Sequence, residues 1–102
     1  MNTIFDVYLQ KIRSELAIKV AELFYRIQDL SDGKDRSTKF YKIFIAKPRS
    51  SMRKISEEEI ISRRDLYRIK ARYNRTIEIC CKMLDETDFY GIMGALIKDK
   101  IY

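Results

Sequence analysis

Apolar residues recur at helical spacing from the start of the chain. They step by three or four positions and share one helix face: Phe5, Leu9, Ile12, Leu16, Val20, Leu23, Ile27 and Leu30. Thr3 can cap this helix, Asp6 favours its N-terminal end, and Gly33 is a natural left-handed stop. The pattern predicts a first helix of about 28 residues, roughly 42 Å long.

A second apolar stretch, 40–46, follows a polar loop and precedes Pro48. Its aromatic and β-branched residues would also suit a strand. We expect a helix, because the stretch resembles the C-terminal part of the chain. Residues 47–55 are interpreted as a basic linker.

A capping box predicts where the third element begins. Ser56 stands at the N-cap and Glu59 three residues on. Apolar residues then continue at helical spacing: Leu66, Ile69, Tyr73, Ile77, Cys80 and Leu84. We therefore expect a second long helix over about 57–85, and a short fourth helix capped by Thr87.

The two halves of the chain resemble one another. Residues 38–46 match residues 87–95 at Thr, Phe, Tyr, Ile and Ala positions. This similarity predicts an internal duplication of 4–46 and 60–101, joined by the linker 47–55. A chance agreement between two amphipathic helices is the alternative. The expected fold is all-α, with two long helices that are each followed by a short helix in one domain, 1–102.

Length and composition fit this fold. With 102 residues, three glycines and one proline, the chain has few turn signals and room for one domain. A core of this size is modest, so a homodimer is one expected state. The absence of a secretory signal, of a long apolar run and of separated cysteines favours an intracellular protein with no membrane span.

Positive charge is concentrated in the middle of the chain. Residues 34–75 carry fourteen basic and five acidic side chains, whereas the flanking segments are slightly acidic. Arg64, Arg68, Arg72 and Arg75 fall within a narrow arc of the third element, opposite its apolar face. Arginine suits phosphate, so we interpret this arc as a nucleic-acid-binding face, extended by Arg49, Arg53 and Lys54. A solvated face, or one neutralised by acids of another helix, is the alternative.

Other chemistry is weakly represented. Without histidine there is no imidazole catalysis, and two adjacent cysteines cannot complete a four-ligand metal site. No nucleotide-binding or hydrolase motif occurs. We therefore expect a binding protein without enzymatic activity, metal or cofactor.

Gly91 and Gly94 within the fourth helix require a reason, because glycine lowers helix stability. Close approach of another helix is one explanation. The other is a groove that receives a peptide or helix of another protein, which is the alternative function. Its expected lining is Phe40, Phe44, Phe89, Met93, Tyr90, Gly91 and Gly94.

The composition carries one resemblance. Isoleucine, lysine, arginine and tyrosine are frequent, while asparagine and glutamine occur twice each. In this and in its length the chain resembles small orphan proteins of filamentous viruses that infect hyperthermophilic archaea. The resemblance implies an accessory role in the cytoplasm of an infected host cell. It assigns a function neither to Phe40-Tyr41 nor to Ser56-Glu57-Glu58-Glu59.

Overall fold

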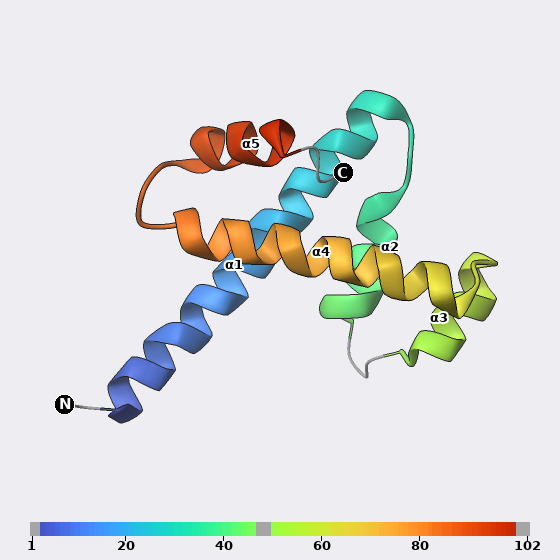
Figure 1. Cartoon of the computed structure of the whole chain (residues 1–102), viewed down its shortest axis with the longest axis horizontal. Coiled ribbons are helices and arrows are strands. Elements are labelled where there is room, and N and C mark those ends of the chain that lie inside the picture. Colours follow the sequence, from blue (N-terminus) through green and yellow to red (C-terminus); the bar gives the residue numbers. More distant parts are fainter. Residues whose placement is uncertain (1–2, 47–49, 100–102) are drawn as a thin grey trace.

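The computed structural model describes residues 3–46 and 50–99, and all regular structure in these ranges is helical (Figure 1). The helices are α1 (Thr3–Asp32), α2 (Arg36–Phe44), α3 (Met52–Glu59), α4 (Arg63–Met83) and α5 (Phe89–Lys98). The all-α prediction is confirmed, including the helical state of 40–44. Long and short helices alternate as predicted in α1–α2 and α4–α5, whereas the internal duplication stays a prediction.

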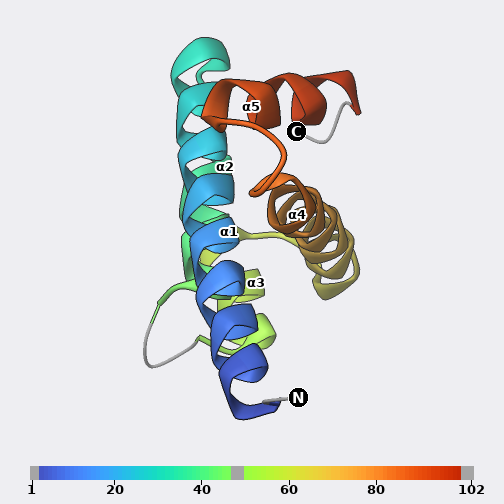
Figure 2. The same cartoon turned by 90° about the vertical axis from the view of Figure 1, so that its left-hand side faces the viewer.

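The core lies where α1 and α4 cross, with α2 packed against both (Figures 1 and 2). Ala17 and Ala21 of α1 are fully buried, and small side chains let helix backbones approach closely at such a crossing. Beside them, Tyr25 packs against Phe40 and Tyr73, with ring centroids 5.4 and 4.7 Å away. An aromatic cluster therefore joins α1, α2 and α4.

Hydrogen bonds satisfy the hydroxyl groups of this cluster. The hydroxyl groups of Tyr25 and Thr76 are hydrogen-bonded at 2.6 Å, and the Thr76 hydroxyl also lies 3.2 Å from the Arg72 carbonyl oxygen. The Tyr73 hydroxyl donates to the Arg36 carbonyl oxygen at 3.0 Å. Burial raises the pKa of Tyr25 to about 12, so the phenol stays neutral.

The face of α1 that packs into the core is not the face predicted from the spacing of its leucines and isoleucines. Phe24 and Tyr25 are buried, whereas Leu16, Leu23 and Leu30 are exposed. Periodicity predicted the helix and its end at Gly33, whose φ is 74°. It did not identify the buried side, because α1 has apolar residues on two faces.

The predicted linker and third element are partly wrong. Residues 52–55 belong to α3, and Ser56 lies inside that helix. The chain then turns at Ile60, whose φ of 54° is left-handed, and Ser62 caps α4 by accepting a hydrogen bond from the Asp65 amide. The predicted capping box therefore fails, because Ser51 and Ser62 cap two separate helices where one was expected.

The cap of α5 also differs by one residue. Asp88 accepts a hydrogen bond from the Gly91 amide at 3.0 Å, so Asp88 and not Thr87 is the N-cap. A Cβ atom at Gly91 would lie 1.9 Å from the Thr87 hydroxyl oxygen. Gly91 therefore makes room for the preceding turn, which neither of the two predicted explanations anticipated.

Candidate nucleic-acid interface

All four arginines predicted to form a basic face are exposed, and three of them lie along the first half of α4. Arg64, Arg68 and Arg72 project from positions four residues apart, and successive members of such a series lie on neighbouring turns of one helix face. The opposite side of α4 carries the buried Leu66 and Tyr73, as predicted. Packing therefore fixes the helix so that these guanidinium groups reach solvent.

Ion pairs divide the arginines into two groups. Arg68 has one weak neighbour, with 3.9 Å between its guanidinium and the Asp65 carboxylate, and both side chains are exposed. Among residues 3–46 and 50–99, no ion pair within 4.0 Å is formed by Arg64 or Arg72. These three side chains keep most of their capacity to bind an anion.

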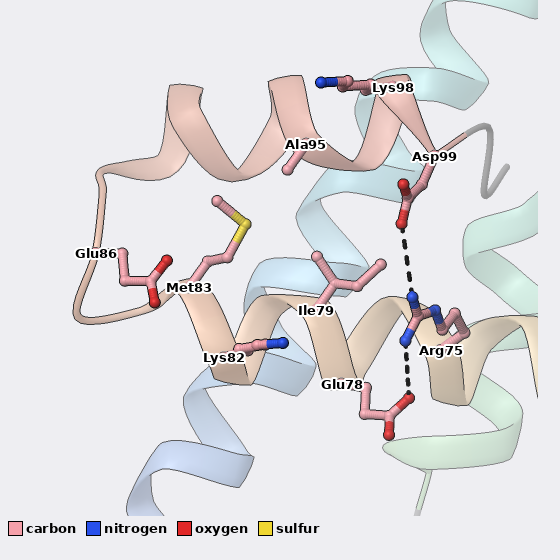
Figure 3. Close-up of a pocket in the computed structure, with 9 residues that line it drawn as sticks. All are labelled: Arg75, Glu78, Ile79, Lys82, Met83, Glu86, Ala95, Lys98 and Asp99. Carbon is pink, nitrogen blue, oxygen red and sulfur yellow. Dashed lines mark ion pairs between the residues drawn. The ribbon is translucent and has the colours of Figure 1, made fainter.

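Arg75 differs in having two carboxylates within 4.0 Å of its guanidinium, from two different segments of the chain. Its guanidinium nitrogens lie 3.5 Å from a Glu78 oxygen and 3.8 Å from an Asp99 oxygen, and Figure 3 shows it bridging α4 and the end of α5. It lines a cavity of about 460 Å³ between these helices, which contains three basic and three acidic side chains: Arg75, Lys82, Lys98, Glu78, Glu86 and Asp99. This balanced cavity offers a polyanion no net attraction.

The row of Arg64, Arg68 and Arg72 leads instead to a second concavity, between α4 and the start of α2. Its volume is about 380 Å³, and its lining is mainly basic: Lys34, Asp35, Arg36, Lys39, Ile69, Arg72 and Tyr73. Arg72 belongs to both the α4 row and this concavity. Lys34 and Lys39 were not among the predicted site residues, although they lie within the basic segment 34–75.

The contacts around this concavity explain which cations are available. Arg36 pairs with Asp32 at 2.6 Å and with Asp29 at 3.5 Å, so α1 holds its guanidinium. Asp29 also accepts hydrogen bonds from the Arg36 and Ser37 amides, and Asp35 caps the Thr38 amide. Since the N-terminal amides of α2 are occupied internally, an anion there would be bound by side chains.

The predicted extension by α3 is weaker. The Arg53 guanidinium lies 3.3 Å from the Glu57 carboxylate, while Lys54 is exposed. Arg49 lies outside the described residues. Of the acidic run, Glu58 and Glu59 are engaged by Lys42, at 2.9 and 3.6 Å.

The residues predicted to line a protein-binding groove do not form one surface. Phe40 is fully buried and Phe44 packs against it, with ring centroids 4.9 Å apart, so both belong to the core. Met93 and Phe89 are partly buried on α5, where Tyr90 and Gly94 are exposed. The groove prediction placed core residues on the surface, because spacing alone could not show that α2 packs into the α1–α4 crossing.

Comparisons with protein families, curated proteins and solved structures find no match to this chain. Among the described residues, no helix is long and apolar enough to cross a bilayer. Within the same residues, no cluster of three or more potential His, Cys, Asp or Glu ligands has the geometry of a metal site.

Proposed function

We propose that this protein is a non-enzymatic accessory protein that binds nucleic acid through the phosphate backbone. The surface involved, here called the basic face, consists of Arg64, Arg68, Arg72, Lys34 and Lys39. The observation that carries the proposal is the convergence of two distant segments: Arg72 of α4 lines one concavity together with Lys39 of α2 and Lys34, which precedes α2.

The composition of the basic face supports contacts to phosphate. Arginine offers a planar fork to phosphate oxygens, and lysine contributes a point charge. Net charge of +6, concentrated in residues 34–75, would steer a polyanion towards this side of the molecule. Tyr67, which is exposed on α4, adds a ring that can stack on a base.

The same geometry argues for weak sequence preference. A row of exposed arginines on the surface of α4 would contact the phosphate and sugar groups of the nucleic-acid backbone. Such contacts position a protein on nucleic acid without distinguishing bases. We therefore expect similar affinity for duplexes of different sequence.

Salt dependence tests this proposal. Each phosphate neutralised on duplex DNA contributes about −0.9 to the slope of log affinity against log salt, so five cations give a slope of roughly −4.5. Fluorescence anisotropy with a labelled duplex measures this slope. The double variant Arg68→Gln/Arg72→Gln should flatten the slope by about 2 and weaken different sequences equally.

Arg75→Gln is the matched control, because Arg75 lies on the same helix but has the carboxylates of Glu78 and Asp99 beside its guanidinium. It should leave the slope nearly unchanged. Lys34→Gln/Lys39→Gln tests the concavity separately and should flatten the slope by about 2 as well. No binding by the wild type at low salt, or equal effects of the Arg75 and Arg68/Arg72 variants, contradicts the proposal.

A further inference from the structure

The first helix carries four leucines at intervals of seven residues, and all four are exposed. Leu9, Leu16, Leu23 and Leu30 are 43%, 48%, 46% and 87% exposed, and Ile12 between them is 45% exposed. Seven residues are almost two helical turns, so these side chains form one row along α1. We call these five residues the leucine face.

The leucine face is separate from the part of α1 that builds the core. At 100° per residue, the leucines are centred roughly 130° away from the buried Ala17, Ala21, Phe24 and Tyr25. No helix of the described ranges covers the first turns of α1, which project from the body of the molecule (Figures 1 and 2). Ile4, Val7 and Tyr8 add further exposed apolar surface there.

This combination points to a partner helix. A contiguous apolar patch larger than roughly a few hundred Å² is rare on monomers and marks an interaction site. Two helices pack as a coiled coil through two apolar positions in every seven, and the leucines supply one of these positions, each leucine fitting between residues of the facing helix. The row extends along nearly all of α1, a helix of 30 residues and about 45 Å.

We propose that the leucine face packs against the leucine face of a second copy of this chain, in an antiparallel α1–α1 dimer. A repeat of this kind is self-complementary, because the same spacing serves both partners. The inference concerns a different helix from the basic face and does not depend on nucleic-acid binding.

The charges along α1 select the antiparallel arrangement. Lys19 and Arg26 occupy the positions that alternate with the leucines, seven residues apart and both exposed. A parallel dimer would place each of them against its own copy, and like charges there oppose association. An antiparallel dimer centred on Leu16 places Leu9 opposite Leu23 of the second copy, and Lys19 within one turn of that copy's Glu15, while Leu30 lies beyond the paired leucines.

Sedimentation equilibrium with the full chain tests the dimer. The wild type should have twice the 12.2 kDa chain mass. Leu16→Glu should reduce it to a monomer, because the charge would face its own copy at the centre of the interface. Leu16 is half exposed, so circular dichroism should show an unchanged helix content in the folded monomer.

Ile97→Glu is the matched control, because Ile97 on α5 is 46% exposed and Leu16 is 48% exposed. It should remain a dimer. A monomeric wild type, or a Leu16→Glu variant of wild-type mass, overturns the proposal.

Cysteine cross-linking tests the orientation, in a background with Cys80→Ala and Cys81→Ser. Leu16→Cys should form an intermolecular disulfide with itself. Leu9→Cys should do so only when mixed with Leu23→Cys. Efficient cross-linking of Leu9→Cys alone would indicate a parallel dimer and overturn the antiparallel arrangement.

Discussion

The two long helices, α1 and α4, cross at the centre of the molecule and build the same core, but they differ in what they expose. Beyond its core face, α1 displays leucines, whereas α4 displays arginines. Each helix therefore carries a second surface that folding of the single chain does not use. We propose that the difference reflects two kinds of contact, one with apolar protein surface and one with an anion.

The largest expected effect is a difference in stability between substitutions at two neighbouring residues of α1, one on its core face and one on its leucine face. Phe24 is fully buried, while Leu23 is 46% exposed. Phe24→Ala should lower the free energy of unfolding by about 3–5 kcal/mol, because it leaves a cavity beside the aromatic cluster. Leu23→Ala should cost less than about 1 kcal/mol.

Urea unfolding on the Leu16→Glu background measures both changes without a contribution from the dimer. A Leu23→Ala variant as unstable as Phe24→Ala would show that the leucine face is buried within the chain. It would contradict the claim that folding of the single chain does not use this face.

Neighbouring cysteines provide the corresponding test on α4. Cys80 lies in the core, and burial raises the pKa of its thiol to about 12, whereas Cys81 is partly exposed. Thiolate is the reactive form, so alkylation at neutral pH should modify Cys81 at least about tenfold faster than Cys80, as expected where Cys80 reacts only after local opening.

The single-thiol variants Cys81→Ser and Cys80→Ala allow the two alkylation rates to be measured separately by mass spectrometry. In denaturant the two rates should converge, which controls for intrinsic reactivity. Comparable native rates would mean that α4 is rotated from the orientation that exposes Arg64 and Arg72.

The sequence predicted helices better than it predicted their faces. Steps of three and four identified α1, and the same spacing correctly placed Leu66, Tyr73 and Cys80 on the buried side of α4. On α1 the leucine spacing was equally regular, yet the core uses Ala17, Ala21, Phe24 and Tyr25. Which apolar face is buried depends on the elements that pack against it, and that information is not local.

The candidate site was predicted in part for a similar reason. The arginine row follows from positions along one helix, so local spacing sufficed for Arg64, Arg68 and Arg72. The ion pair between Arg75 and Asp99, and the position of Lys34 and Lys39 next to Arg72, depend on contacts between distant segments. The basic segment 34–75 had indicated the region without indicating the arrangement.

The smallest expected effect concerns how the helices α1 and α3 end. Both α1 and α3 are followed by a residue in the left-handed region, Gly33 with φ of 74° and Ile60 with φ of 54°. Glycine adopts this conformation without a steric penalty, whereas an L side chain costs about 1–2 kcal/mol, and a β-branched residue there is an outlier. Ile60 is 92% exposed, so its side chain contributes little burial in return.

Ile60→Gly should therefore raise the free energy of unfolding by about 0.5–1 kcal/mol, the relief of strain being partly offset by the greater entropy of glycine in the unfolded chain. Gly33→Ala should lower it by about 1 kcal/mol, although nothing lies within 4 Å of the added Cβ atom, because strain and not a clash would cause the loss. Thermal unfolding followed by circular dichroism measures both. A destabilising Ile60→Gly substitution would contradict the left-handed conformation of residue 60. It would favour instead the single long helix over about 57–85 that the spacing of apolar residues predicts.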